Sequence, residues 1–254
     1  MVTIKKPQEI KIIKEGGRRL ARVLDELSLE LKPGVSANRL DTLAQSLILN
    51  YGGRPSFLHY KPDFASQSFP AGLCVSPNEI IVHGVPKKEM ILKSGDIVSL
   101  DIGMEYKNFY TDMSASWPIG EVKPELLKLI KVTKTALARA ILVARAGNRL
   151  GDIGYAIQSY VNSQGFMVIK DLIGHGVGYG VHEDPDVLNY GRPNTGLKLE
   201  PGMVLAIEPM VTFFNPNIKQ KSDGSFVTID NLPAAHFEHT IIITKGAAQI
   251  ATKI

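Results

Sequence analysis

Two aspartates in apolar surroundings are the first residues of the sequence whose types and spacing could do chemistry. Asp101 lies in the run DIVSLDIG and Asp112 in the run FYTDMSAS, and residues 105–108 between them could close a hairpin. A hairpin with that turn places the two aspartates directly opposite each other, with their Cβ atoms ~4.5–5.5 Å apart, where like charges are destabilising. Two exposed aspartates near a turn are the alternative, but the apolar context favours a buried pair that needs cations.

One histidine and two glutamates have surroundings of a similar kind. His175 lies between glycines in GHGVG, which leaves its imidazole uncrowded. Glu208 lies in the apolar run MVLAIEPM and Glu238 in HFEHTIIIT, where an unpaired buried carboxylate would be costly. Either glutamate alone could equally reach a sheet edge. Together with the two aspartates, however, the four carboxylates carry four negative charges, which two divalent cations balance.

The donor set indicates which ions would fit. Carboxylate oxygens with one imidazole suit Mn(II), Fe(II) or Co(II) better than a metal selected by thiolates, and Zn(II) accepts the same donors. Two such ions ~3.5–4 Å apart lower the pKa of a bridging water and hold both ends of the bond that is hydrolysed. The residues alone therefore predict a hydrolase with two divalent metal ions.

The elements that must position these residues follow a repeating order. Apolar spacing predicts helices over 7–31, 36–51, 124–146 and 151–164. Short apolar runs predict strands at 73–82, 96–104 and 109–119, and further short strands follow residue 165.

This order indicates an internal duplication. Gly34, Gln45 and Gly52 are matched 113 residues later by Gly147, Gln158 and Gly165. We therefore predict an α/β (α+β) protein whose two similar helix–helix–strand halves, roughly 7–120 and 121–250, surround one central site. No linker separates the halves, so residues 1–254 are expected to form a single domain.

The composition fits this class and excludes several others. The chain has 254 residues, 44% hydrophobic and 21% charged, which is typical of a globular protein rather than a collagen-like, coiled-coil or disordered one. A single cysteine excludes an internal disulfide. No run approaches the ~20 apolar residues of a membrane span, and the start of the chain lacks a signal-peptide pattern. We expect a cytoplasmic protein without membrane contact, and the net charge of +4 without a basic run predicts no specific nucleic acid partner.

Longer strings around these residues carry a resemblance. They are GHGVGYGVHEDPDVLNY, IIVHGVP, LDIG, YTDMSAS, AIEPM and FEHT. Together they resemble type I methionine aminopeptidases, over almost the whole chain from residue 5 to 247. These enzymes belong to the superfamily of aminopeptidase P, prolidase and creatinase, whose fold is the duplicated pita-bread arrangement. The resemblance implies removal of the initiator methionine from nascent chains whose second residue is small.

The resemblance also implies a metal-binding role for each of the five residues found above. Asp112 and Glu238 would bridge two ions, Asp101 would hold one ion, and His175 and Glu208 would hold the other. Glu208 would in addition take the proton of the nucleophilic water.

Substrate contacts follow from the same resemblance. His182 would stabilise charge on the carbonyl oxygen, and His83 would position the substrate or help proton transfer. Tyr60, Phe69 and Cys74 would bind the methionine side chain, with Cys74 as a small buried residue rather than a nucleophile.

The chain departs from the family pattern around this pocket. The segment between residues 60 and 69 resembles an insertion, and a tryptophan often found before the last ligand is missing, with Ser225 or Phe226 near its place. His236 stands where an amide is expected. We expect none of these positions to touch the metal ligands, so they bear on the methionine pocket rather than on hydrolysis.

Two other interpretations can be compared with this one. Superfamily members that cut before proline commonly carry an N-terminal domain, for which the residues before the first helix leave no room. A pita-bread protein that binds RNA or ribosomes without catalysis would have lost metal ligands, whereas all five are present here. We expect a monomer that acts on N-terminal peptides of nascent chains and touches the anionic ribosome surface weakly, through contacts that added salt would weaken.

Overall fold

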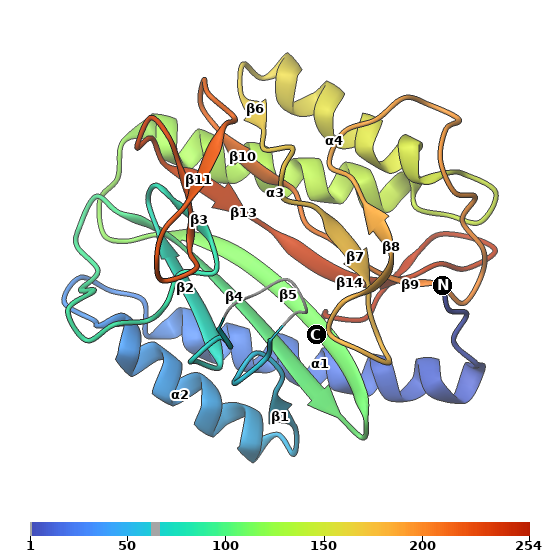
Figure 1. Cartoon of the computed structure of the whole chain (residues 1–254), viewed down its shortest axis with the longest axis horizontal. Helices are drawn as coiled ribbons and strands as arrows, with labels where there is room; N and C mark the ends of the chain where they lie inside the picture. The colour runs from blue at the N-terminus through green and yellow to red at the C-terminus, as the bar shows by residue number, and fades with distance from the viewer. Residues whose placement is uncertain (1, 62–66) are drawn as a thin grey trace.

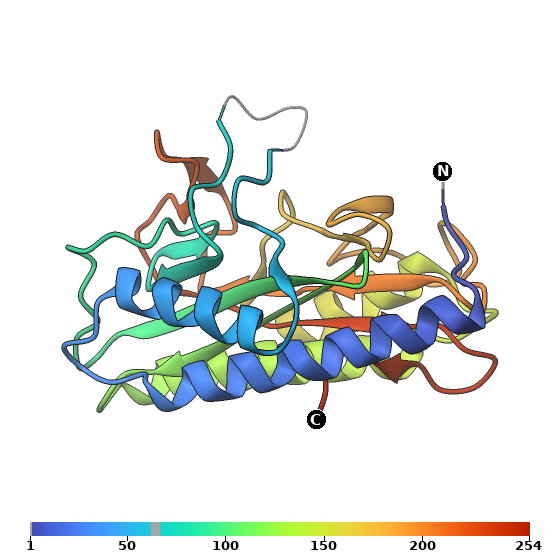
Figure 2. The ribbon, with the colours of Figure 1, turned by 90° about the horizontal axis from the view of Figure 1, so that it is seen from below.

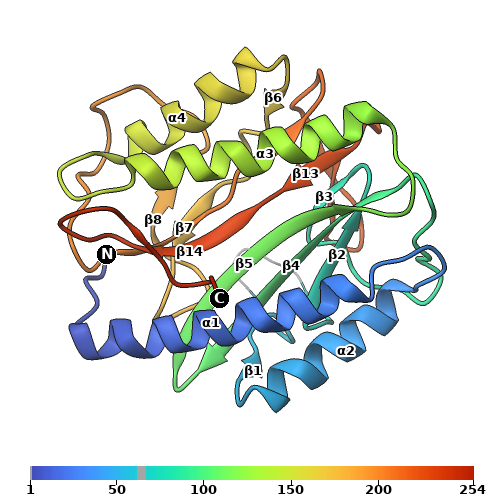
Figure 3. The same ribbon diagram turned by 180° about the vertical axis from the view of Figure 1, so that it is seen from behind.

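The structure, a computed structural model, describes residues 2–61 and 67–254. Helices in these residues are α1 (Pro7–Leu29), α2 (Ala37–Asn50), α3 (Pro124–Val143) and α4 (Leu150–Ser163). All of them lie on one face of a large sheet, in front of it when the molecule is seen from behind (Figure 3). The four predicted helices are confirmed, and no helix in the described ranges is long and apolar enough to cross a membrane.

Strands and the loops between them make up the rest of the described chain. The strands are β1 (Arg54–Pro55), β2 (Leu73–Pro77), β3 (Ile80–Val82), β4 (Ile97–Tyr106), β5 (Phe109–Pro118), β6 (Met167–Val168), β7 (Gly174–Gly176), β8 (Glu183–Val187), β9 (Val204–Ile207), β10 (Met210–Thr212), β11 (Ile218–Gln220), β12 (Phe226–Thr228), β13 (Ala234–His236), β14 (Glu238–Ile242) and β15 (Gln249–Ile250). The central antiparallel sheet has the order β1-β4-β5-β14-β9-β7-β8, with β2 on β4 and β15 on β14 (Figure 1). Two small sheets, β13-β10-β6 and β11-β12-β3, lie beside it.

The second helix of each half repeats at the shift seen in the sequence. A shift of 113 residues takes the bounds of α2, Ala37 and Asn50, to those of α4, Leu150 and Ser163. Buried residues 40, 41, 44 and 48 of α2 correspond at the same shift to buried residues 153, 154, 157 and 161 of α4. The sequence repeat therefore reflects two helices that bury the same face. The assignment of the whole chain to one domain stays a prediction.

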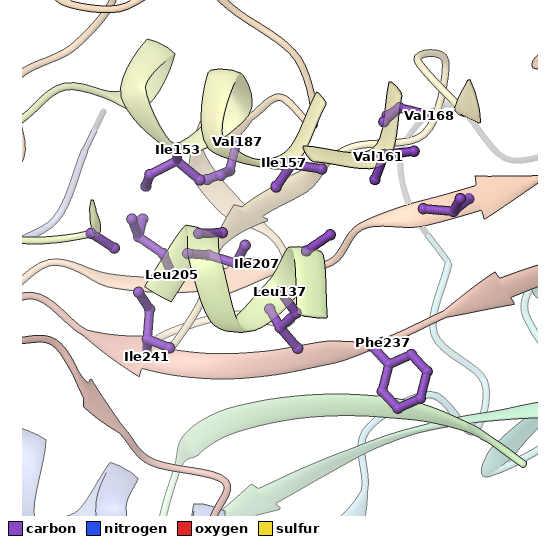
Figure 4. Packing of buried hydrophobic residues seen from close by; sticks show 14 of the residues in the cluster. Leu137, Ile153, Ile157, Val161, Val168, Val187, Leu205, Ile207, Phe237 and Ile241 are labelled. Carbon is purple, nitrogen blue, oxygen red and sulfur yellow. The ribbon is translucent and has the colours of Figure 1, made fainter. Parts of the chain in front are cut away.

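Apolar packing fixes the helices on the sheet. Residues of α3 and α4, with Leu137 and Ile157 among them, pack against Leu205, Ile207 and Ile241 of the central strands (Figure 4). A second cluster joins α1 and α2 to β2, β4 and β5. Burial of this apolar area is the main term that holds the helical layer on the sheet.

The β4–β5 hairpin corrects one prediction. The turn is formed by Lys107 and Asn108, with φ of 50° and 65°, and it follows the pair Tyr106–Phe109. A two-residue turn with both φ positive matches the right-handed twist of the strands. Asp101 is consequently opposite Ser114 rather than Asp112, so the predicted register was wrong by two residues. Because the side-chain period of a strand is two, both aspartates still share one face.

The alternation of side chains decides which face of the sheet carries polar groups. Leu100, Ile102 and Met113 belong to the cluster that packs on α1 and α2. Asp101 and Asp112 alternate with them and therefore project from the opposite face. That face carries the loops, on the side away from the helices (Figure 2).

Gly154 tests the packing of α4. A Cβ at this position would overlap the carbonyl group of Tyr190. We expect Gly154→Ala to lower the free energy of unfolding by about 2 kcal/mol, although alanine is the better helix former by about 1 kcal/mol. Asn162→Ala, on the exposed face of the same helix, is the control and should change it by less than about 0.5 kcal/mol. Urea unfolding followed by circular dichroism measures both, and equal or greater stability of Gly154→Ala would contradict this packing.

Candidate metal centre

The five predicted metal ligands come from five strands that are consecutive neighbours in the central sheet. Asp101 lies in β4, Asp112 in β5, Glu238 at the start of β14 and His175 in β7, and Glu208 follows β9 directly. All four carboxylates are buried, with exposed fractions between 2% and 9%. The sheet order alone therefore brings together residues that are far apart in the sequence.

Ligand atoms in this region form two groups that share Glu238. Asp112, His175 and Glu238 each offer an atom within 4.8 Å of the others, and so do Glu208, His236 and Glu238. The two groups are adjacent, because Nε2 of His175 lies 3.4 Å from Oε1 of Glu208. A carboxylate common to both groups is well placed to bridge two ions.

Asp101 lies beside these groups and belongs to neither of them. Its carboxyl group interacts with Asp112 and with the Cys74 thiol, and burial raises the pKa of Asp101 to about 6. Oδ1 of Asp101 has no hydrogen-bond partner in the described part of the chain. Its neighbourhood is the predicted one, and its role as a ligand stays a prediction.

Burial and mutual repulsion disfavour ionised carboxylates at this site. Burial is the largest cause that raises the pKa of Asp112, Glu208 and Glu238 well above the usual range, and neighbouring carboxylates raise the pKa of Asp112 and Glu238 further. Among residues 2–61 and 67–254, Oδ1 of Asp112 and Oε1 of Glu238 have no hydrogen-bond partner. Unpaired buried oxygens are costly, and a bound cation would remove that cost. The donors therefore fit divalent cations.

His175 presents a free nitrogen lone pair to this region. Its Nδ1 lies 2.9 Å from the carbonyl oxygen of Gly176, which can only accept, so Nδ1 carries the proton. Burial lowers the pKa of His175 to about 4, which keeps the imidazole neutral at neutral pH. Nε2 is left with the lone pair and could bind a metal, the arrangement usual for a ligating histidine.

Hydroxyl and amide groups that the sequence analysis did not single out hold the backbone of two candidate ligands. The Thr240 hydroxyl accepts from the Asp112 N–H at 2.8 Å and donates to the Asp112 carbonyl at 2.8 Å. Nδ2 of Asn189 donates to the Glu208 carbonyl at 3.0 Å. These hydrogen bonds join strands or loops far apart in the sequence, so no local sequence pattern predicts them.

The two histidines predicted to contact substrate lie near the histidines of this site, because His182 contacts His175, and burial together with the charges of His182 and His236 lowers the pKa of His83. The ring of His182 stands edge-on to that of His175, with centroids 4.4 Å apart, and its Nδ1 lies 2.8 Å from the Tyr60 hydroxyl. His83 packs edge-on against Phe226 at 5.7 Å. Burial is the main cause that lowers the pKa of His182 to about 3 and that of His83 to about 4.

The residues predicted to bind the methionine side chain meet in one apolar cluster. Buried Phe57, Cys74 and Val181 form its centre, with Tyr60, Phe69 and Tyr110 packed against it. Sequence analysis did not single out Phe57, Val181 or Tyr110, although Val181 directly precedes His182. The predicted insertion between residues 60 and 69 includes residues 62–66, which lie outside the described residues.

His236 joins the candidate ligands, a role that the sequence analysis did not assign to it. It was noted because a histidine replaces an expected amide. The expectation that it touches no metal ligand is wrong, because its Nε2 lies 3.5 Å from Oε2 of the candidate ligand Glu208. Its position two residues before Glu238 was the available signal, because residues i and i+2 of one strand share a face, although here β13 ends at His236 and β14 begins at Glu238.

Comparisons with known proteins agree with this geometry. Residues 11–245 match the family model described as metallopeptidase family M24. Methionine aminopeptidase 1 of Bacillus subtilis (strain 168) is 41% identical over 255 residues, covering 100% of both chains. The chain belongs to the methionine aminopeptidases of this metallopeptidase family. The methionine aminopeptidase of Clostridium acetobutylicum is 43% identical, with 99% of each chain covered.

Solved structures place the fold in the same family. The crystal structure of methionine aminopeptidase from Thermotoga maritima superposes with a TM-score of 0.94 at 42% identity, over 100% of both chains. The Xaa-Pro dipeptidase from Bacillus anthracis, at 23% identity and a TM-score of 0.77, shares the fold, and the match covers 62% of that longer chain. The predicted pita-bread fold and metallopeptidase class are confirmed.

Thr240 tests how the metal centre is held. Thr240→Val keeps the shape but leaves the Asp112 N–H and C=O groups unpaired, so we expect a loss of about 3 kcal/mol in the free energy of unfolding. Thr240→Ser keeps the hydroxyl and should lose only about 1 kcal/mol for a buried methyl group. Denaturant unfolding compares the variants, and equal losses for valine and serine would show that the hydroxyl does not hold Asp112.

Proposed function

We propose that this chain is an aminopeptidase that removes the initiator methionine from proteins whose second residue is small. The observation that carries the proposal is the convergence of four buried carboxylates and Nε2 of His175, in a chain aligned over its whole length with methionine aminopeptidases. Hydrolysis of an unactivated amide requires a strong nucleophile and stabilisation of the developing oxyanion. Both requirements point to the metal centre and the histidines around it.

The proposal includes two divalent cations, held by Asp101, Asp112, His175, Glu208 and Glu238, with Asp112 and Glu238 shared. Unpaired buried carboxylate oxygens support this assignment. When bound, such ions would lower the pKa of a water molecule and polarise the scissile carbonyl group. Oxygen donors with imidazole favour Mn(II), Fe(II) or Co(II), and Zn(II) accepts the same donors.

Glu208 is assigned as the group that handles protons. Its buried carboxylate faces the site, with Oε1 3.4 Å from His175 Nε2 and Oε2 3.5 Å from His236 Nε2. Burial makes a carboxylate a stronger base than an exposed one. A Glu208 carboxylate oxygen would take the proton of the attacking water and deliver it to the leaving amino group.

His182 is assigned as the donor to the carbonyl oxygen of the scissile bond. If the Tyr60 hydroxyl donates to Nδ1 of His182 across 2.8 Å, Nε2 carries the ring proton and is available to donate. A neutral imidazole, as the lowered pKa of His182 implies, gives a hydrogen bond without a net charge. Such a preorganised donor is worth about 3 kcal/mol of barrier lowering.

His83 and the apolar cluster would orient the substrate. His83 has a left-handed backbone, φ of 56°, and its ring is fixed against Phe226. The cluster centred on Phe57, Cys74 and Val181 is apolar and adjacent to His182 through Tyr60, which suits an unbranched thioether side chain. We assign this cluster to the methionine side chain.

The natural substrates would be N-terminal peptides of nascent chains. A cytoplasmic location, a monomeric state and weak contact with the ribosome belong to the same proposal. A net charge of +4 without a basic run supports a contact of that modest strength.

Peptide hydrolysis tests the activity. Metal-free protein titrated with Mn(II), Fe(II), Co(II) or Zn(II) should release methionine from Met-Ala-Ser but no residue from Ala-Ala-Ser, and little from peptides with a bulky second residue. Glu208→Gln should lower kcat by at least about 100-fold, because it removes the proton acceptor, whereas Glu200→Gln at an exposed glutamate should not.

Three outcomes distinguish the candidate functions. Release of methionine alone supports the proposal. Release of other N-terminal residues, or cleavage before proline, would assign the site to another peptidase of the superfamily. No release with any metal by folded protein would favour a binding protein.

Tyr60→Phe tests the orientation of His182. The variant keeps the aromatic ring and removes the hydroxyl that lies against Nδ1 of His182. Loss of one such hydrogen bond, about 1.4 kcal/mol, should lower kcat about tenfold. The KM for Met-Ala-Ser should change less, because the ring stays in the pocket. A raised KM with unchanged kcat would instead assign Tyr60 to the pocket alone.

A further inference from the structure

His236 is a buried histidine whose ring has no hydrogen-bond partner in the described part of the chain. It is 1% exposed, and neither Nδ1 nor Nε2 has a hydrogen bond there. Burying a polar group without a partner costs about 1–3 kcal/mol. An apolar residue would be more stable at a buried position where no polar group can pair with it. The histidine is therefore expected to bind a partner other than a protein side chain.

The backbone of His236 is fixed by a serine. The Ser116 hydroxyl accepts from the His236 N–H at 2.9 Å and donates to the His236 carbonyl at 2.9 Å. Ser99 lies 2.7 Å from the same hydroxyl and donates to it, because the Ser116 proton is already engaged. This arrangement repeats the one between Thr240 and Asp112. The backbones of His236 and Asp112 are therefore each fixed by two hydrogen bonds to one hydroxyl group.

The ring of His236 points into the metal centre. Nε2 lies 3.5 Å from Oε2 of Glu208 and 4.0 Å from Oε2 of Glu238. These separations are too long for good hydrogen bonds. Ligand atoms that share one ion, each ~2.1 Å from it, lie about 3–4 Å apart. Both distances from Nε2 fall in this range, and the ligand atoms of all three residues lie within 4.8 Å of one another.

We propose that Nε2 of His236 is a metal ligand, together with Glu208 and Glu238, and that this chain binds its two cations with two imidazoles. The inference rests on the proposed dinuclear site. Nε2 of His175 and Nε2 of His236 lie 3.4 and 3.5 Å from the two oxygens of the Glu208 carboxylate, so both imidazoles would face the ion that Glu208 holds.

A second imidazole would change the metal preference of the site. A neutral nitrogen adds a bond without altering the balance between four carboxylates and two divalent ions. Imidazole suits Fe, Zn and other borderline metals better than Mn or Mg, which prefer oxygen. The metal-binding position beside Glu208 should accordingly prefer Co(II) over Mn(II) more strongly than the same position without His236.

Proton NMR of the Co(II)-loaded protein counts the ligating histidines directly. A histidine bound through Nε2 keeps a proton on Nδ1, which gives a strongly shifted signal that disappears in deuterated water. We expect two such signals in the unaltered chain, one in His236→Gln, and two in His239→Gln. His239 is the matched control because it is the next histidine in the chain, and its Nδ1 is paired with Thr252 at 3.0 Å.

Calorimetric titration with Co(II) gives a second readout. Loss of one ligand should weaken one of the two binding steps by at least about 10–100-fold, the range seen even for groups that only support a ligand. The other step, and both steps in His239→Gln, should change little. Circular dichroism verifies that each variant is folded.

The outcomes separate the two proposals. Two bound Co(II) ions with one exchangeable signal in the unaltered chain would overturn the role of His236 and leave the dinuclear site intact. Failure to bind Co(II) at all would overturn the dinuclear site itself. The count in the unaltered chain decides the matter even if His236→Gln does not fold, and His175→Gln should then leave the single signal of His236.

Discussion

Four carboxylates buried beside one another impose the constraint on which the site depends. Asp101, Asp112, Glu208 and Glu238 are buried, so ionisation of one carboxylate raises the free energy of ionising its neighbours. The basic groups that face them are the imidazoles of His175 and His236, and burial keeps both neutral. Protonation or bound cations must therefore compensate the charge. Because the carboxylates repel one another, a rigid backbone must hold them in place, and the central sheet provides that backbone.

The sheet supplies that frame by dividing its two faces. Alternation along β4, β5 and β14 sends apolar side chains to the helices and carboxylates to the opposite face, so the same backbone that is stabilised by burial also carries the repulsive charges. Between β5 and the strands β13 and β14, two hydroxyls replace ladder contacts. Thr240 binds the backbone of Asp112 and Ser116 binds the backbone of His236, on either side of the pair Ser114–Glu238. Each hydroxyl pairs with one backbone N–H and one backbone C=O. These bonds fix the neighbouring strands relative to each other beside the buried carboxylates.

The sequence could predict what depends on local periodicity and on residue type. The helices, the alternating strands, the repeat and the convergence of carboxylates with His175 follow from spacing and from the cost of burying charge. The hairpin register could not be derived in the same way, because it depends on which two residues adopt positive φ, and these are Lys107 and Asn108 rather than the two central residues of EYKN. Phe57, Val181 and Tyr110 were also out of reach, since they become neighbours only when β5 and the loops before β2 and β8 pack together. His236 was visible as an exception but had no partner until β9 and β14 placed Glu208 and Glu238 beside it.

That exception shows how a metal site can change without a change in its chemistry. Replacing an amide by an imidazole two residues from Glu238 leaves the number of carboxylates unchanged, so two divalent ions would still balance the charge and Glu208 would keep its proposed role as proton acceptor. What changes is the affinity and selectivity for the ion beside Glu208, because a nitrogen donor favours softer ions than oxygen does. The charged ligands determine how many divalent ions the site can balance, whereas the neutral ligands determine which metal it prefers. A buried histidine at this position therefore alters metal choice while the residues assigned to hydrolysis stay the same.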